Sequence, residues 1–371
     1  MGASLGFIPG FLATVLSEDL DVSRGMIGLI VGIYFGATGI GSIPAGRFTD
    51  KFGARYVATI NMLLVAGSSL LIAFFDTYAM WIIGSVVGGM GYALGNTSTN
   101  VAIGHAVPLE RRALAMSVKT SGVPLMATIA AAITPWAANV WSWERVLVFN
   151  AIVAAISGIF TYLVLDDDRS ESTTGSGLIP LPKDFYWFGI AAFLLIGGSQ
   201  PLYSWTVSYL EESLNAPASL SGGIMAIASF TGVIVMICNG VWADRLGELK
   251  RIPLVMLLLS VSALSVCLVI LGTILGTFIV VIGLTLGVST QLAAIGTMHA
   301  AVIDKAPKSV GRATGITMTG YYLGALVTPA GFGLLVDISD TYIYSWLATL
   351  VILITAVGAW HRAGKVQTQR D

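Results

Sequence analysis

The sequence predicts an all-α membrane protein with twelve transmembrane helices in two pseudo-symmetric six-helix bundles. Three observations lead to this prediction. Hydrophobic residues make up 56% of the 371 residues and charged residues only 11%, whereas soluble domains average about 25% charged residues. Twelve apolar runs follow one another along the chain. A short polar motif also recurs at the same place in the two halves of the sequence.

The apolar runs are expected to be helices, because a helix needs about 20 apolar residues to cross a bilayer core and satisfies its own backbone there. The first six runs are Met1–Leu16, Met26–Pro44, Tyr56–Phe75, Tyr78–Ile103, Ala113–Val140 and Val146–Leu165. The next six are Trp187–Leu210, Leu220–Val241, Ile252–Leu271, Gly276–Val302, Ala313–Val336 and Tyr342–Trp360. Alternation with a period of two, which would indicate strands, is absent.

The first run is short for a span and contains Pro9 as well as several glycines. No basic segment precedes it, so a signal peptide is a poor interpretation. We expect this first helix to be truncated, and the natural protein to start upstream of Met1.

A polar stretch divides the runs into two sets of six. It begins with three aspartates at position 166 and is rich in Ser, Gly and Pro, as linkers are. The predicted domains are an N-terminal six-helix bundle (1–165), a cytoplasmic linker (166–186) and a C-terminal six-helix bundle with a short cytoplasmic tail (187–371).

Basic residues predict the orientation in the membrane. Sixteen lie on the side of the termini, and only Arg24 and Arg145 lie on the other. Because Lys and Arg are enriched in cytoplasmic loops, both termini are expected in the cytoplasm. The chain is predicted to be an integral plasma membrane protein, in a prokaryote a protein of the cytoplasmic membrane.

Several function classes are disfavoured. The net charge of −1 and the lack of a Lys/Arg-rich tract argue against a nucleic-acid partner. Cys238, Cys267 and the three histidines form no metal motif, so neither a metal nor a cofactor is expected. The nearest approach to a catalytic pair is His299 with Asp304, which stand alone. We therefore do not expect an enzyme.

The repeated motif has the pattern G-x(3)-D-[KR]-x-G, first from Gly46 to Gly53 and again from Gly240 to Gly247. An aspartate beside a helix end can pair with Lys or Arg, or cap the N-terminus of a neighbouring helix. The alternative is a basic loop that only sets orientation. The predicted gating residues are Gly46, Arg47, Asp50, Lys51, Gly53, Arg55, Gly240, Asp244, Arg245, Gly247, Arg112 and Arg312.

These two loops resemble the signature of the major facilitator superfamily. The run Asn96-Thr-Ser-Thr-Asn100 and the segment around Lys119 and Pro124 are similar to motifs of its cyanate-porter and nitrate/nitrite-porter-like branches. The resemblance implies a secondary transporter that works by alternating access, with the motif loops latching the two halves. One departure is that Trp81–Val87 lacks the arginine that many proton-coupled members carry.

Lys119 is the one charged residue that the sequence places well inside a span, about 10 Å beyond Arg112. A lysine near the bilayer centre costs about 2.5–3.5 kcal/mol, so a functional role is favoured, although snorkelling toward the headgroups is an alternative. Asn96, Thr99 and Asn100 share one helix face. We expect Lys119 and these three residues to bind a small, anionic organic or inorganic solute.

Weaker binding candidates are polar-tipped residues within spans, for which packing is the alternative. They are Tyr34, Gln200, Tyr203, Gln291, Tyr321 and Tyr322. The expected partners are a small-molecule substrate, a coupling ion and the lipid bilayer, with the chain acting as a monomer. The alternative functions are an exporter of amphiphilic drug-like compounds and a non-transporting membrane sensor or scaffold.

Overall fold

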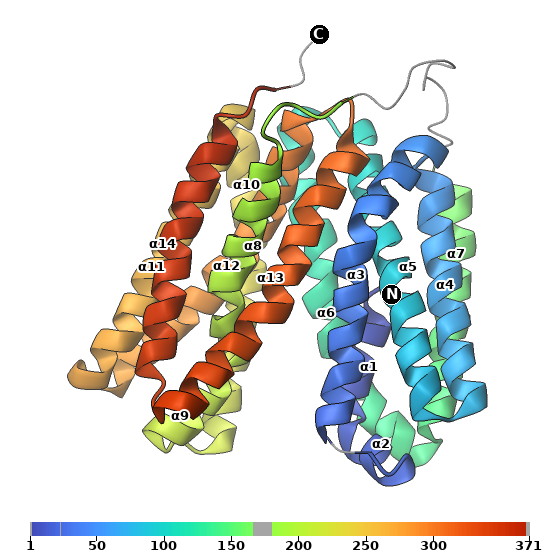
Figure 1. The fold of residues 1–371 in the computed structure, drawn as a ribbon, viewed down its shortest axis with the longest axis horizontal. Coiled ribbons are helices and arrows are strands. Elements are labelled where there is room, and N and C mark those ends of the chain that lie inside the picture. Colours follow the sequence, from blue (N-terminus) through green and yellow to red (C-terminus); the bar gives the residue numbers. More distant parts are fainter. Residues whose placement is uncertain (1, 23, 166–179, 369–371) are drawn as a thin grey trace. The chain divides into compact units, whose positions relative to one another are not determined.

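The computed structural model describes residues 2–22, 24–165 and 180–368, and these fold into helices joined by short turns (Figure 1). The first part contains α1 (Ser4–Phe11), α2 (Ala13–Asp19), α3 (Arg24–Phe52), α4 (Ala54–Phe75), α5 (Tyr78–Ala106), the 3-10 turn η1 (Leu109–Arg111), α6 (Arg112–Val140) and α7 (Trp143–Val164). The second contains α8 (Tyr186–Ser204), α9 (Thr206–Leu214), α10 (Ala218–Leu246), α11 (Glu248–Leu275), α12 (Thr277–Lys305), α13 (Val310–Ser339) and α14 (Ile343–Gly364). Most of the predicted linker lies outside the described residues.

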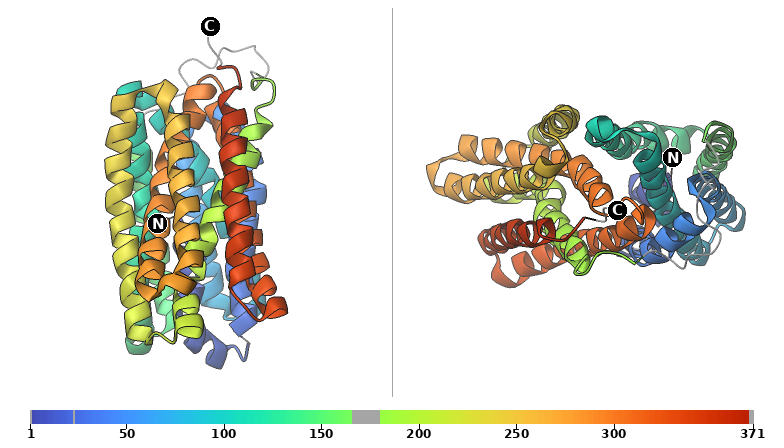
Figure 2. Two further views of the ribbon diagram at one scale, coloured as in Figure 1. Left: turned by 90° about the vertical axis from the view of Figure 1, so that its left-hand side faces the viewer. Right: turned by 90° about the horizontal axis from the view of Figure 1, so that it is seen from above.

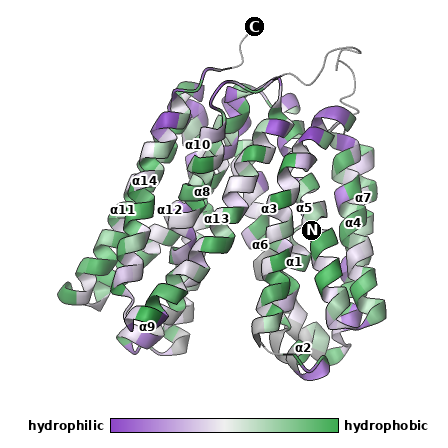
Figure 3. Cartoon of the chain, in the orientation of Figure 1, coloured by the Kyte–Doolittle hydropathy of each residue, from purple (hydrophilic) through white to green (hydrophobic). Residues whose placement is uncertain are grey.

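The described helices account for the twelve predicted spans. Nine of them are long and apolar enough to cross a membrane, namely α3, α4, α5, α7, α10, α11, α12, α13 and α14. The 29-residue helix α6 corresponds to the fifth predicted span. The pairs α1–α2 and α8–α9 supply the remaining two. Hydrophobic residues predominate along these helices and hydrophilic residues gather toward their ends (Figure 3), as expected for elements solvated by lipid.

The first and seventh predicted spans are each two helices rather than one, which corrects the sequence prediction. The first is interrupted at Leu12 and the seventh at Trp205. A proline lies shortly before each interruption, at Pro9 and Pro201. Proline lacks the N–H that would bond one turn back and crowds the preceding turn, so a helix bends or breaks near it.

Helices α3 and α10 extend beyond their predicted C-terminal ends. Helix α3 continues through Pro44 to Phe52, and α10 continues to Leu246. Asp50 and Asp244 therefore lie within the last helical turns and not, as the sequence suggested, in loops that follow the helices. The turns come directly afterwards at Gly53 (φ 84°) and Gly247 (φ 82°), in a backbone conformation that favours glycine. The end of each unit that carries this turn is called its basic end.

The chain forms two compact units. Unit 1 contains Met1–Ala106, Gly122–Pro180 and Lys308–Thr319, and unit 2 contains Val107–Ser121, Leu181–Pro307 and Gly320–Asp371. The units thus differ from the predicted bundles at two places. The beginning of α6 belongs with the second half of the sequence, and the beginning of α13 belongs with the first half.

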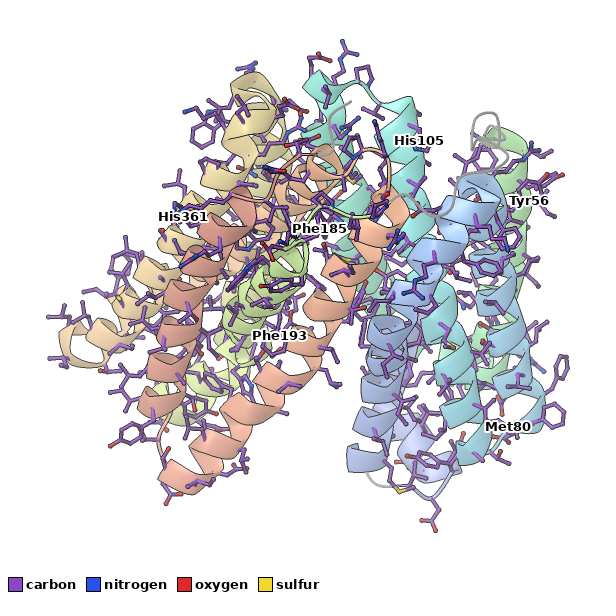
Figure 4. All side chains as sticks on the ribbon, turned by 45° about the horizontal axis from the view of Figure 1, so that its top comes forward. Tyr56, Met80, His105, Phe185, Phe193 and His361 are labelled. Atoms are coloured by element: carbon purple, nitrogen blue, oxygen red, sulfur yellow. The ribbon has the colours of Figure 1, made fainter. Side chains whose placement is uncertain are left out.

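Unit 1 is built on the neighbouring helices α3, α5, α4 and α7. Trp81 and Trp143 pack in its core with ring centroids 5.7 Å apart, and the indole of Trp143 donates a hydrogen bond of 2.9 Å to Asp19. Asn150 donates to the hydroxyl of Ser69 between α7 and α4. Polar groups inside the helices thus find partners, as a lipid environment requires. Figure 4 labels His105 toward the basic end of the unit and Met80 toward the other end.

Unit 2 is built on α11 and α12, which pack against each other and against α14 and α10 respectively, while α8 packs against α14. Figure 2 shows α14, in red, beside α8, in light green. Phe188 of α8 meets Trp360 of α14 edge-on, with centroids 5.7 Å apart. Ser262 and Thr290 share a hydrogen bond of 2.8 Å between α11 and α12. Helix α12, at the centre, is buried along most of its second half.

Candidate functional site

In unit 1, Asp50 caps the first turn of α13. One carboxylate oxygen accepts the N–H of Gly311 at 2.8 Å, and the other accepts the N–H of Arg312 at 3.0 Å. The first N–H groups of a helix have no partner within it, and the positive end of the helix dipole favours a carboxylate there. Asp50 comes from the first half of the sequence and α13 from the second, so this Asp50 cap ties the halves together.

The backbones at this cap touch. A Cβ atom added to Gly46, one turn before Asp50, would overlap the carbonyl oxygen of Gly311 and lie 3.2 Å from the Cα atom of Arg312. Only glycine lets α3 and α13 approach this closely. The first glycine of the motif therefore serves the close approach, and Gly53, at positive φ, serves the turn.

Unit 2 repeats the arrangement with Asp244 and α6. The two oxygens of Asp244 accept the N–H groups of Ala113 and Leu114, both at 2.8 Å. These are the second and third residues of α6, just as Gly311 and Arg312 are the second and third residues of α13. A Cβ atom on Gly240 would lie 2.9 Å from the Cα atom of Leu114. The prediction that the motif caps a neighbouring helix thus describes both copies.

The Asp244 cap has an additional ion network. Arg251, fully buried at the start of α11, donates to Asp244 at 2.8 Å and also contacts Asp304 and the carbonyl oxygen of Leu109. Arg112 donates to the other oxygen of Asp304 at 2.8 Å. Two arginines and two aspartates thus compensate one another, as buried charges require. Sequence reasoning did not assign Arg251 or Asp304 to this site, although both are charged residues at the ends of apolar helices.

Unit 1 has other residues at the equivalent positions. His105 occupies the penultimate place of α5 that Asp304 occupies in α12, and Val57 follows Gly53 by four residues as Arg251 follows Gly247. Of the other predicted gating residues, Arg55 lies 4.1 Å above the ring of Tyr162. The side chains of three of them are exposed at the basic ends, namely Arg47, Lys51 and Arg245.

The polar face of α5 is buried in unit 1. Asn96 and Asn100 are 8% and 1% exposed, and the amide of Asn96 donates to the sulfur atom of Met318 at 3.3 Å. The hydroxyl of Thr99 donates to the carbonyl oxygen of Gly95 at 2.7 Å, within its own helix. These three residues belong to unit 1, whereas Lys119 belongs to unit 2.

Lys119 lies half-buried on α6 beside the contact of α6 with α12. A Cβ atom on Gly296 would lie 2.9 Å from the backbone nitrogen of Ser117, two residues before Lys119. Three residues beyond Gly296 is His299, which is 5% exposed and lies within electrostatic range of the Lys119 ammonium. From the sequence, His299 was considered only with Asp304, as a pair that stands alone.

Asn239 of α10 completes this polar region of unit 2. Its amide donates to the hydroxyl of Thr297 at 2.7 Å and to the carbonyl oxygen of Ala293 at 3.1 Å. Within the described part of the chain, the side-chain oxygens of Asn239, Ser117 and Thr120 are buried without a hydrogen-bond partner. Buried polar atoms of this kind mark places where water or a ligand binds.

The remaining binding candidates fall into two groups. In unit 2 the amide of Gln291 donates to Gln200 at 3.3 Å, which links α12 and α8. The others are tyrosines. Tyr34 is fully buried in unit 1, where its hydroxyl donates to the carbonyl oxygen of Gly2 at 2.6 Å. In unit 2, Tyr203 is partly exposed, and the rings of Tyr321 and Tyr322 pack edge-to-face 5.3 Å apart.

A pocket of about 310 Å³ opens at the basic end of unit 2, between α11, α12 and α14, and neither Lys119 nor His299 lines it. Its charged and titratable lining residues are Glu248, Asp304, Lys305, His361 and Lys365. Among the described residues, no group of three or more His, Cys, Asp or Glu side chains is arranged to hold a metal ion.

Long apolar helices, polar groups inside them and the same cap on two helices define a multi-span transport protein. The sequence matches the Major Facilitator Superfamily over residues 1–329, and the chain belongs to this family of small-solute transporters. It is a transporter and not an enzyme.

Among the relatives that align over most of the chain are two with named substrates. The nitrite extrusion protein of Bacillus subtilis (strain 168) is 24% identical over 403 residues, which cover 99% of this chain and 96% of that protein. The gentisate transporter of Corynebacterium glutamicum is 25% identical over 361 residues, which cover 88% of this chain and 76% of that protein.

Among solved structures, the E. coli fucose:proton symporter FucP has the same fold. It aligns with a TM-score of 0.74 at 14% identity, over 97% of this chain and 96% of that one. The predicted family and the twelve-helix fold class are confirmed.

Proposed function

We propose that the protein is a secondary transporter that moves a small anion across the plasma membrane by alternating access. The observation that carries this proposal is the position of Lys119. Lys119 lies two turns inside α6, on the same helix segment as the buried hydroxyls of Ser117 and Thr120. A cation in this low-dielectric setting attracts an anion far more strongly than it would in water, and the hydroxyls of Ser117 and Thr120 can donate hydrogen bonds that orient the ligand.

The relatives support an anion as the substrate. Among the relatives that align over most of the chain, two are named for anions, nitrite in one case and gentisate in the other. Nitrite is small and inorganic, whereas gentisate is an aromatic carboxylate. An ammonium can pair with either of them, which fits the breadth of the predicted solute class.

The two caps support alternating access. Each joins the last turn of one helix to the first turn of a helix from the other half of the sequence, through two N–H···O bonds. Such hydrogen bonds can break and form again while every helix stays folded. We propose that they hold the halves together at the basic ends in one state and release them in the other.

A ligand screen tests the substrate class. Because a ligand that binds the native state raises its apparent stability, gentisate and nitrite are expected to raise the denaturation temperature of the purified protein. Glucose and choline should leave it unchanged. Labelled gentisate should then enter proteoliposomes by counterflow, and nitrite should compete with it. Stabilisation by amphiphilic cations alone would favour the drug-exporter alternative instead.

The basic residues support a topology with both termini in the cytoplasm. A cysteine introduced as Gly175→Cys, in a background lacking Cys238 and Cys267, is expected to resist a membrane-impermeant maleimide in intact cells and to react after permeabilisation. A cysteine at Thr341, in the turn between α13 and α14, is the matched control and should react from outside. Labelling of position 175 in intact cells would contradict the topology.

A further inference from the structure

The pocket at the basic end of unit 2 has no part in the transport proposal, and three helix ends give it fixed walls. Lys305, the last residue of α12, donates hydrogen bonds of 3.1 Å and 2.7 Å to the carbonyl oxygens of Gly364 and Val366 at the end of α14. A Cβ atom on Gly364 would lie 3.3 Å from the side chain of Ile252, in the first turns of α11. The pocket of about 310 Å³ between these helices is therefore a built cavity.

The lining of the pocket carries an excess of positive charge. Asp304 is paired with two arginines, so its charge is already compensated. The other charged lining residues are Glu248, Lys305 and Lys365, which together leave one positive charge. His361, labelled on α14 in Figure 4, adds to this charge when its imidazole is protonated. An excess of one positive charge matches the single negative charge of a phosphodiester, which lysine binds well.

The rest of the lining is apolar and extends into the hydrocarbon depth of a bilayer. It includes Leu249, Pro253 and Met256 of α11, and Leu249 is 79% exposed. Helix α11 has 28 residues, a length of about 42 Å, which matches the roughly 40–45 Å of a bilayer with its headgroups. The segment from Glu248 to Met256 covers about 12 Å of that length, whereas the headgroup region of one leaflet is roughly 5–8 Å deep. The pocket thus begins among headgroups and ends beside acyl chains.

Exposed apolar side chains continue from the pocket along two of its helices. On α11 they include Leu257 and Leu264, which are 48% and 56% exposed, and on α14 they include Ile354, which is 58% exposed. They follow Pro253 and precede His361 at helical spacing, so they lie on the same helix faces as these lining residues. Acyl chains can pack along these faces, whereas a soluble phosphate ester would make no use of them.

We propose that this pocket binds an anionic phospholipid of the leaflet at the basic ends. Lys365 pairs with the phosphodiester, Lys305 adds its positive charge, and the acyl chains lie along α11 and α14. With the proposed topology this is the cytoplasmic leaflet, where anionic lipids are enriched and where basic pockets between membrane helices bind their headgroups. The lipid is a bound ligand and not the transported solute, so the inference is independent of the proposed anion transport.

Native mass spectrometry of the purified, delipidated protein tests the site. The first molecule of dioleoylphosphatidylglycerol should bind with about fivefold or higher affinity than the first molecule of dioleoylphosphatidylcholine, because one basic residue beside an anionic lipid is worth about this factor. The two lipids have the same acyl chains and differ in the headgroup. Equal affinity for both lipids would overturn the proposal.

Lys365→Gln removes an exposed cation of the lining and should lower the affinity for phosphatidylglycerol about fivefold, while binding of phosphatidylcholine is unchanged. The matched control is Arg362→Gln, which removes the same charge from an exposed position of α14 that does not line the pocket. Its affinity for phosphatidylglycerol should stay within about twofold of the wild-type value. Equal losses in the two variants would mean that the lipid responds to any charge on this surface, and would contradict binding in the pocket.

Glycerophosphoglycerol, the deacylated headgroup, distinguishes a lipid from a soluble phosphodiester. It carries the same phosphodiester and no acyl chain, so in molar excess it should leave binding of phosphatidylglycerol unchanged. Competition by this soluble headgroup would assign the pocket to a soluble phosphate ester and would overturn the lipid as its ligand.

Discussion

Replacement of Lys119 by alanine is expected to weaken binding of gentisate about 30-fold or more, and to raise the KM for uptake by a similar factor. Loss of one partner from a desolvated charge pair costs about 2–5 kcal/mol, and each 1.4 kcal/mol is a factor of about ten in affinity. Lys119→Arg keeps the charge but replaces a compact ammonium with a planar fork, so we expect part of the affinity to return. Uptake kinetics in proteoliposomes measure both variants.

The matched control is Lys250→Ala, which removes the same charge from an exposed position at the basic end of unit 2. It should leave KM within about twofold of the wild-type value. If Lys119→Ala transports gentisate with the KM of Lys250→Ala, the side chain only snorkels toward the headgroups and the anion proposal falls.

The fold could be predicted from the sequence because the strongest signals can be read from each apolar run separately. Apolar length and the position of basic residues are properties of each run, and neither depends on which helices become neighbours. The sequence does not predict the interruptions at Leu12 and Trp205, because the apolar pattern continues across Pro9 and Pro201. A proline inside a membrane helix is tolerated elsewhere in this chain, as Pro44 shows within α3, so proline alone does not identify a break.

The site was predicted only in part, for a related reason. The motif aspartates could be identified as helix caps, but their partners could not, because Gly311 and Arg312 lie more than 250 residues from Asp50. In the sequence, Arg251 is one of several basic residues in a loop that sets orientation. In the structure, its side chain is buried between two aspartates. The region around His299 could not be predicted either, because α12 and α6 come from different halves of the sequence and only the fold brings Gly296 against Ser117.

The Asp50 cap yields the sharpest test of the gating proposal, through a single methyl group. In Gly46→Ala the new Cβ atom meets backbone atoms of Gly311 and Arg312. Backbone cannot rotate aside as a side chain can, so the ends of α3 and α13 must separate, and overpacking of this kind costs about 1–3 kcal/mol. The two hydrogen bonds of Asp50 lengthen as a result. We expect kcat for uptake to fall about tenfold or more, with KM changed less than threefold.

Gly28→Ala is the control on the same helix, because a Cβ atom at Gly28 meets nothing within 4 Å and alanine favours a helix over glycine. It should transport like the wild type. Asp50→Asn tests the charge without the clash. Its amide keeps one acceptor but turns an NH₂ group toward a helix N-terminus, so kcat should again fall while the protein still inserts. If Gly46→Ala and Asp50→Asn both turn over like Gly28→Ala, the cap only anchors α13, and the gate must lie elsewhere.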